Sequence, residues 1–235
     1  MKELRFDINP QIIKYNSSIR TKSNIIAIII EVSRFLIVSK PQPQENILSS
    51  IEPGKIRLGI YIDKMSRIFI SENAKIHSFS FPFQLKEEGE GERYIISFEN
   101  NIITNVMLSV LSRVFQDISD TGSVEEIVEE FWGADEEFQL SSDEKDVIEK
   151  LITYLLCFEP GYLRLDDETV QKSEDAKNKR KKDKITHPDI HIDMNYSGAT
   201  TFKLGLVNLI TCEQLIDLVN INEPCMFLFG PPKVR

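Results

Sequence analysis

The stretch that decides the fold of the last third of this chain reads His187-Pro-Asp-Ile-His-Ile-Asp-Met-Asn195. Side chains of a β-strand alternate between two faces, and polar and apolar residues alternate here in the same way. One face would carry Asp189, His191, Asp193 and Asn195, and the other Ile190, Ile192 and Met194. Two of the three histidines in the 235-residue chain lie in this stretch. We therefore predict a β-strand whose polar face carries residue types that bind metal ions or transfer protons.

The segment from Thr201 to Leu206 predicts the partner of this strand in an antiparallel hairpin. Only one parity of register makes the two apolar faces coincide, because a slip by one residue turns every side chain to the other face. The predicted opposed pairs are Asp193 with Lys203, His191 with Gly205, and Met194 with Phe202. This register predicts an open space over Gly205. If the segment from Tyr162 to Asp166 lies alongside, Arg164 and Asp166 join the same polar face.

The rest of the chain reads as strands, then helices, then strands again. Alternating apolar residues predict strands at residues 4–8, 57–62, 67–70, 76–85 and 94–98, and an apolar run predicts a last strand at 225–229. Apolar positions three and four apart and capping residues predict helices from a cap at Ser23 or Asn24 to residue 38, from 101 onward, from 123 to before Gly133, from 141 to Pro160, and at 211–219. This order predicts an α+β fold, with a mainly antiparallel sheet packed against several helices.

We predict a single domain over residues 1–235 with three sub-lobes. Residues 1–100 are rich in predicted strands, residues 101–158 form an acidic helical lobe, and residues 159–235 hold the β-hairpin and a helix. Thirteen acidic residues and one lysine lie between Asp117 and Glu149, so this segment alone is more negative than the whole chain, whose net charge is -9. Residues 171–184 are lysine-rich and almost without apolar side chains, which predicts a mobile basic loop.

Histidine and cysteine positions add two structural predictions. His77 shares the parity of the aromatic residues in segment 76–85, so we predict a core histidine rather than a ligand. The three cysteines are far apart in sequence and are predicted to be reduced core residues. The first seven residues do not have the apolar core expected of a signal peptide, and charged residues interrupt the longest apolar run, residues 25–38. The expected location is cytoplasmic, without membrane contact.

Four explanations of the polar face are open: three functions, and a purely structural layer of ion pairs. In the first, His187, His191 and Asp193 bind a divalent metal ion as cofactor. In the second, the same metal serves a hydrolase acting on phosphodiesters, with Asp166 as base and Lys203 as electrostatic stabiliser. Convergence of these groups in an accessible concavity would favour the enzyme, whereas a buried His191 bonded to backbone would favour the structural layer.

In the third function, Arg164 and Lys203 hold an anionic group without a metal ion. The other predicted binding residues are Asp189, Asn195, Lys179 and Arg180, the last two in the basic loop. Nucleic-acid contact is expected only through residues 177–184 of that loop, because the acidic lobe would repel phosphates. The acidic lobe instead favours a basic protein partner.

Two resemblances bear on function. Pro188-Asp189 followed by Thr201-Phe-Lys203 resembles the layout of the PD-(D/E)xK nucleases, although Thr201 stands where that layout needs an acid, so that Asp193 would have to substitute. Gly161-Tyr-Leu-Arg-Leu-Asp166, His187 to Asp193, and Thr201-Phe-Lys-Leu-Gly-Leu206 together resemble a pattern in poorly characterised bacterial proteins of phage-defence islands and mobile elements. This resemblance covers the last third of the chain. It implies a non-enzymatic accessory component of a multiprotein system, beside an ATPase, a nuclease or a reverse transcriptase.

Overall fold

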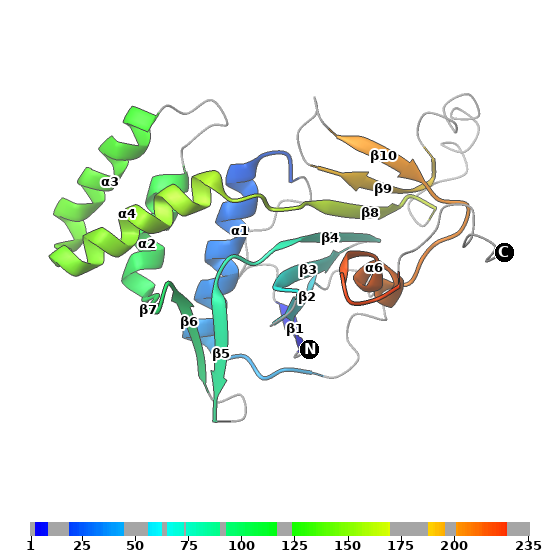
Figure 1. The fold of residues 1–235 in the computed structure, drawn as a ribbon, viewed down its shortest axis with the longest axis horizontal. Helices are drawn as coiled ribbons and strands as arrows, with labels where there is room; N and C mark the ends of the chain where they lie inside the picture. The colour runs from blue at the N-terminus through cyan, green and yellow to red at the C-terminus, as the bar shows by residue number, and fades with distance from the viewer. Residues whose placement is uncertain are drawn as a thin grey trace.

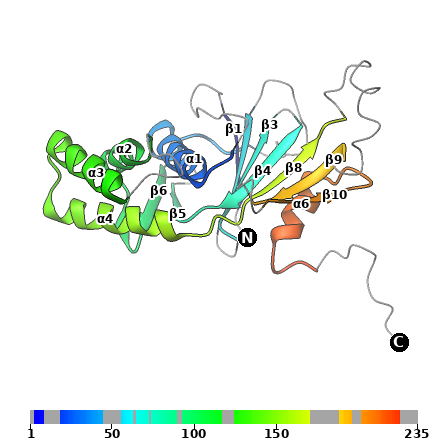
Figure 2. The same ribbon diagram turned by 90° about the horizontal axis from the view of Figure 1, so that it is seen from above.

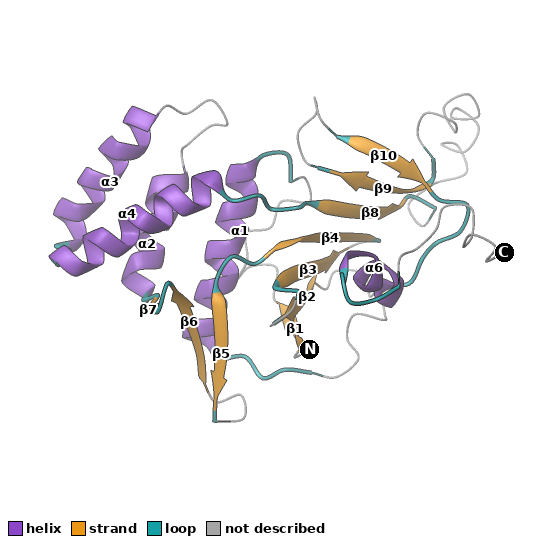
Figure 3. Ribbon diagram, in the orientation of Figure 1, coloured by secondary structure: helices purple, strands orange, loops and turns teal. Residues whose placement is uncertain are grey.

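The computed structural model describes residues 3–8, 19–44, 56–62, 65–72, 74–89, 93–116, 124–169, 188–195 and 201–224. Within these residues the predicted α+β fold is confirmed (Figures 1 and 3). The strands are β1 (Glu3–Ile8), β2 (Ile56–Tyr61), β3 (Arg67–Glu72), β4 (Lys75–Ser80), β5 (Gln84–Glu88), β6 (Arg93–Phe98), β7 (Asn101–Ile102), β8 (Leu163–Asp167), β9 (Ile190–Met194) and β10 (Phe202–Gly205). The helices are α1 (Lys22–Arg34), continued by the π-helical turn η1 (Phe35–Ser39), α2 (Asn105–Gln116), α3 (Val124–Phe138), α4 (Ser142–Cys157) and α6 (Cys212–Val219).

One antiparallel sheet runs through most of the described chain, in the strand order β1-β2-β3-β4-β8-β9-β10. Strands β5, β6 and β7 form a separate three-stranded sheet. Helices α1 to α4 gather at one end of the molecule, and β8 to β10 lie with α6 at the other (Figures 1 and 2). The predicted polar face and the acidic helices α3 and α4 therefore lie at opposite ends.

The two faces of the large sheet pack against different helices. Leu58 and Ile70, which point to one face, belong to the main core together with the buried isoleucines of α1. Phe69 and Ile192 point to the other face and form a second core with Leu215 of α6. The apolar half of the predicted histidine strand therefore packs under α6, which leaves its polar half on the same face as α1.

The strand predicted over residues 76–85 is two strands. The chain leaves the large sheet at residues 81–83, so β4 and β5 belong to different sheets. Phe81 and Phe83 in this turn are both buried, as the strand pattern predicts, because the turn itself lies against the core. Apolar residues therefore keep alternating through residues 81–83, so the alternation does not reveal that the strand ends there.

The helix predicted to stop before Gly133 continues to Phe138. Arg113 of α2 forms ion pairs with Glu130 and Glu137, one on each side of Gly133. A Cβ at residue 133 would lie 3.0 Å from Nη2 of Arg113, so glycine leaves room for the guanidinium to cross α3. Glycine inside a helix costs about 1 kcal/mol, and tertiary packing of α3 against α2 outweighs that cost.

Two predicted helix starts are shifted: the helix expected from residue 101 begins at Asn105, after β7, and α1 begins earlier than expected. Ser141 and Thr211 each form a capping box, at the starts of α4 and α6. Helix α1 begins earlier than predicted, because the hydroxyl of Thr21, rather than that of Ser23, accepts a hydrogen bond from the N–H of Asn24. Capping of this kind stabilises a helix by about 1 kcal/mol.

The cysteines lie in different environments. Cys212 is buried, and burial raises the pKa of its thiol to about 12, which agrees with the predicted core role. Cys157 at the end of α4 is exposed, so the prediction of a core residue is wrong for it. Cys225 and the strand predicted at 225–229 lie outside the described residues. None of the helices described here is long and apolar enough to cross a membrane.

Candidate functional site

The predicted hairpin is confirmed in its register. The opposed pairs are Asp193 with Lys203, His191 with Gly205, and Met194 with Phe202. Strand β8 lies on the other side of β9, with Arg164 opposite Asp193 and Asp166 opposite His191. Three neighbouring strands thus bring four charged or titratable residues of the predicted face together with Lys203.

The face that packs against α1 changes its chemistry along the sheet. Ile70 of β3 lies opposite His77 of β4, and His77 lies opposite Arg164 of β8. Directly opposed residues point to the same face of a sheet. This face is apolar on β1, β2 and β3, becomes polar at His77 of β4, and stays polar on β8, β9 and β10. The polar side chains are nevertheless withdrawn from solvent, with relative exposures of 0% for His77 and His191, 3% for Asp166 and 5% for Asp193.

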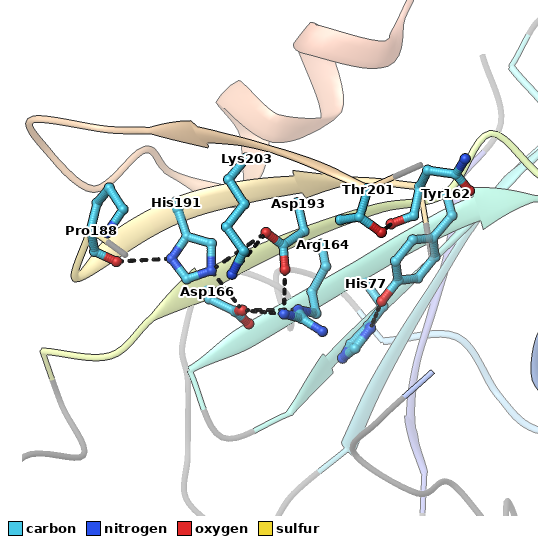
Figure 4. A network of polar contacts seen from close by, with 10 residues as sticks. His77, Tyr162, Arg164, Asp166, Pro188, His191, Asp193, Thr201 and Lys203 are labelled. Atoms are coloured by element: carbon cyan, nitrogen blue, oxygen red, sulfur yellow. Dashed lines mark hydrogen bonds and ion pairs between the residues drawn. The ribbon is translucent and has the colours of Figure 1, made fainter. Parts of the chain in front are cut away.

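Arg164 joins the two carboxylates (Figure 4). Its Nε and Nη2 lie 2.9 and 2.7 Å from Oδ2 of Asp166, and Nη2 also donates to Oδ2 of Asp193. On the β10 side, Nζ of Lys203 lies 3.5 Å from Oδ1 of Asp193. Burial opposes the charge of Arg164, but the carboxylates, Asp166 first, outweigh burial and raise the pKa of the guanidinium. Arg164 is therefore a permanent cation between two acidic side chains.

His191 is oriented by the backbone of Pro188. Nδ1 of His191 lies 3.0 Å from the carbonyl oxygen of Pro188, and because a carbonyl only accepts, Nδ1 carries a proton. Nε2 then faces Oδ2 of Asp166 at 3.2 Å and Oδ1 of Asp193 at 3.6 Å. In a neutral imidazole this nitrogen would be an acceptor facing two acceptors. Arg164 and Lys203 already balance the two carboxylates, and a metal ion between the three atoms would attract the nitrogen as well.

Gly205 provides the space in which Pro188 sits. A Cβ at residue 205 would lie 2.7 Å from Cγ of Pro188, a distance that side chains do not reach without displacement. The prediction of an open space over Gly205 is therefore wrong, because the proline ring fills it. The close approach of Pro188 therefore requires glycine at residue 205. The backbone there does not, because it has ordinary β-strand conformation.

His77 is confirmed as a core histidine. Its Nδ1 lies 2.9 Å from the hydroxyl of Tyr162, and both side chains are buried. Burial, helped by the positive charges of Arg164 and Lys75, lowers the pKa of His77 to about 3. Burial also raises the pKa of Tyr162. His77 is therefore neutral, and it shares a buried hydrogen bond with the Tyr162 hydroxyl.

Not every predicted site residue joins this cluster. Outside the described residues lie His187, Lys179, Arg180 and the basic loop 171–184. Asp189 lies in a bend before β9, and the N–H of Glu168 donates to its carbonyl oxygen. Asn195 ends β9 with a left-handed backbone, φ 70°, and its N–H donates to the carbonyl of Tyr162. The backbone of Asn195 thus ends the strand and pairs with Tyr162.

The converging groups are Asp166, His191 and Asp193, whose nearest potential ligand atoms all lie within 4.8 Å of one another. The sequence predicted His187 as the third ligand, because it is close to His191 along the chain, and assigned Asp166 to catalysis. Asp166 joins the ligands because β8 pairs with β9. Strand parity shows which residues share a face, but it does not show which strands are neighbours. The groups converge but are buried rather than set in an accessible concavity, so the criterion for an enzyme is met only in part. His191 is buried and bonded to backbone, which is the criterion for a structural layer.

A second surface lies on α3, at the other end of the molecule. Val128 and Trp132 are neighbours on this helix and are 44% and 52% exposed. Exposed carboxylates of Glu125, Glu129 and Glu136 lie on the same side, since residues three and four apart share a helix face. We call these five residues the α3 stripe: two apolar side chains bordered by negative charge.

A comparison with protein-family models, with curated proteins and with solved structures finds no match for this chain.

Proposed function

We propose that this protein is a non-enzymatic accessory component of a bacterial multiprotein system, and that it binds a basic segment of a partner protein through the α3 stripe. One observation carries the proposal: the single tryptophan of the chain, Trp132, is half exposed on an acidic helix. Tryptophan contributes more than most residues to protein interfaces, because its large ring loses water contact on binding. An exposed tryptophan beside Val128 is a suitable anchor.

Charge determines which partner fits. Glu125, Glu129 and Glu136 border the two apolar side chains, and α4 adds further carboxylates to the same lobe. Negative charge around an apolar anchor repels nucleic acid and acidic proteins and attracts a segment with both lysine or arginine and apolar residues. The partner surface is therefore expected to be basic and amphipathic.

The wider context follows from the resemblance of the last third of the chain to bacterial phage-defence-island proteins. In such a system the partner would be an ATPase, a nuclease or a reverse-transcriptase-type protein, and this chain would position or regulate it. The helix α3 lies at the opposite end of the molecule from β8, β9 and β10 (Figure 2). A partner can therefore bind the α3 stripe without covering Asp166, His191 and Asp193.

The binding chemistry can be tested with the fluorescence of Trp132, because it is the only tryptophan. The untagged full chain is titrated with a tryptophan-free amphipathic peptide of lysine and leucine, and separately with a peptide in which glutamate replaces lysine. The basic peptide is expected to shift the emission to shorter wavelength as the ring leaves water, and the acidic peptide is not. Val128→Ser is expected to weaken the response at least threefold, whereas Val207→Ser, an exposed valine outside α3, leaves it unchanged. Equal responses to both peptides would contradict the proposal.

The biological role can be tested by phage challenge of bacteria that carry the gene with its neighbours. Trp132→Ala is expected to abolish protection and co-purification with a neighbouring gene product, while the purified variant melts at the wild-type temperature. Protection that survives Trp132→Ala but is lost in Asp193→Asn would overturn the proposal in favour of an enzyme.

A metal-dependent hydrolase acting on phosphodiesters is the second candidate, and the observation that bears on it is the convergence of Asp166, His191 and Asp193. Hydrolysis needs a free base and a cation available to the substrate. Asp166, the predicted base, is bound by Arg164, and Lys203 contacts Asp193. We therefore place partner binding before hydrolysis.

A further inference from the structure

We propose that Asp166, His191 and Asp193 form a binding site for one divalent transition-metal ion, with zinc and manganese as the class of ligand. The site is independent of partner binding by the α3 stripe, because the two surfaces lie at opposite ends of the fold. Asp166, which the sequence assigned to catalysis, is a ligand in this site, whereas the predicted ligand His187 lies outside the described residues.

Two of the three spacings between the ligand atoms are those of a metal site, and all three atoms lie within 4.8 Å of one another. Ligands about 2.0–2.2 Å from a zinc ion are about 3.0–3.5 Å from one another. Nε2 of His191 lies 3.2 Å from Oδ2 of Asp166 and 3.6 Å from Oδ1 of Asp193. The three side chains come from two hydrogen-bonded strands, so the backbone holds them in this arrangement.

The hydrogen bonds of the carboxylates favour a metal ion over a proton. Oδ1 of Asp166 and Oδ1 of Asp193 are buried and accept no hydrogen bond from the residues described. A proton on Nε2 of His191 can serve one of these carboxylates well, but not both. Buried carboxylate oxygens without a hydrogen bond cost free energy, and for Oδ1 of Asp193, Lys203 offers only an ion pair at 3.5 Å. An ion between the side chains would bind Oδ1 of Asp193, a carboxylate oxygen of Asp166 and Nε2 of His191.

The tautomer of His191 is the one a metal site needs. Metal-binding histidines donate their other ring N–H to a carbonyl or a carboxylate, which orients the ring and increases the basicity of the ligating nitrogen. Here Nδ1 donates to the carbonyl of Pro188 (Figure 4). The ring of Pro188 lies against Gly205. The ring is therefore fixed from behind, with Nε2 directed at Asp166 and Asp193.

The donor set selects the class of metal. One imidazole nitrogen and two carboxylates suit zinc and manganese, whereas copper(I) prefers sulfur and calcium prefers six or more oxygens. Arg164 and Lys203 balance the two carboxylates and so limit the affinity. Lys203 has a side chain about one-third exposed and can turn toward solvent when an ion binds.

The test uses the untagged full chain, stripped with a chelator, and measures binding of Zn²⁺ by calorimetry and of Mn²⁺ by electron paramagnetic resonance. We expect one ion per chain. Asp166→Asn and Asp193→Asn are expected to weaken binding at least tenfold, because each removes a charged ligand while keeping the side-chain shape. Asp167→Asn is the matched control: Asp167 is buried on the same strand but faces the other way, and it is expected to change affinity less than twofold.

Wild-type protein provides a readout that does not depend on the folding of variants. Bound Mn²⁺ is expected to show the magnetic coupling of a directly bound imidazole nitrogen. Failure to bind either ion would overturn the proposal and leave the cluster as a layer of ion pairs. Binding without nitrogen coupling, or binding weakened equally by Asp167→Asn, would place the ion elsewhere and overturn it as well.

Discussion

Asp166 on β8 and His191 on β9 are directly opposite each other in neighbouring strands, with 3.2 Å between Oδ2 of the carboxylate and Nε2 of the imidazole. Asp193, two residues beyond His191, completes the cluster from the same face. A cross-strand pair of this kind normally lies on the wet side of a sheet. Here both residues are buried, so the charges around them determine both the stability of the strands and what they can bind.

Replacement of Gly205 by alanine is expected to destabilise the protein by about 1–3 kcal/mol, because the added methyl group overlaps the rigid ring of Pro188. Urea unfolding measures the change. Pro188→Ala removes the obstacle, so Gly205→Ala should cost less in that background, with a coupling free energy of at least about 0.5 kcal/mol. Strictly additive effects of the two substitutions would contradict the proposed contact.

Loss of Arg164 is expected to destabilise the protein by about 3–5 kcal/mol in Arg164→Gln, because two buried carboxylates lose their shared cation. Arg113, which also joins two carboxylates but on the surface, is the control, and Arg113→Gln is expected to cost less than about 1 kcal/mol. Thermal and urea unfolding give both values. If the site binds metal, Zn²⁺ should raise the melting temperature of Arg164→Gln more than that of the wild type; an equal rise would count against competition between Arg164 and the ion.

Removal of the Lys203 charge is expected to tighten metal binding about tenfold in Lys203→Met, because an ammonium near a divalent ion repels it even through a high effective dielectric constant. Stability should change by less than about 1 kcal/mol, since the side chain is partly exposed. Manganese titration followed by electron paramagnetic resonance measures the affinity. Lys86→Met, at an exposed lysine paired with Glu88, should leave the affinity unchanged. An unchanged affinity in Lys203→Met would show that Nζ is not near the ion.

The buried His77 is expected to make the protein less stable in mild acid. Its pKa is about 3 in the folded protein and about 6.5 in the unfolded chain, so only the unfolded state takes up a proton between these values. The resulting penalty is absent above about pH 7 and grows as the pH falls; at pH 5 it amounts to about 2 kcal/mol. Urea unfolding at pH 7 and pH 5 should show a drop in the wild type that is larger by this amount than in His77→Gln. Equal drops would mean that His77 is protonated in the folded state.

The secondary structure was predictable where a local repeat or a cap specifies it. Strand parity placed Asp193 opposite Lys203 and His191 opposite Gly205, because a slip by one residue would have exposed every apolar side chain of the hairpin. Local pattern was not enough at residues 81–83, where a buried turn keeps the alternation of a strand, or at Gly133, where a crossing arginine requires a small residue inside a helix.

The candidate site was likewise predictable in part. The sequence by itself determined which residues of β9 share a face and which partner each has on β10, because alternation and apolar matching act over a few residues. Only the tertiary structure decided that β8 lies beside β9, that Asp166 converges with His191 and Asp193, and that this polar face is buried. The physical reason is that pairing of distant strands and burial depend on the packing of the whole sheet, with α1 on one face and α6 on the other, and no short segment encodes that packing.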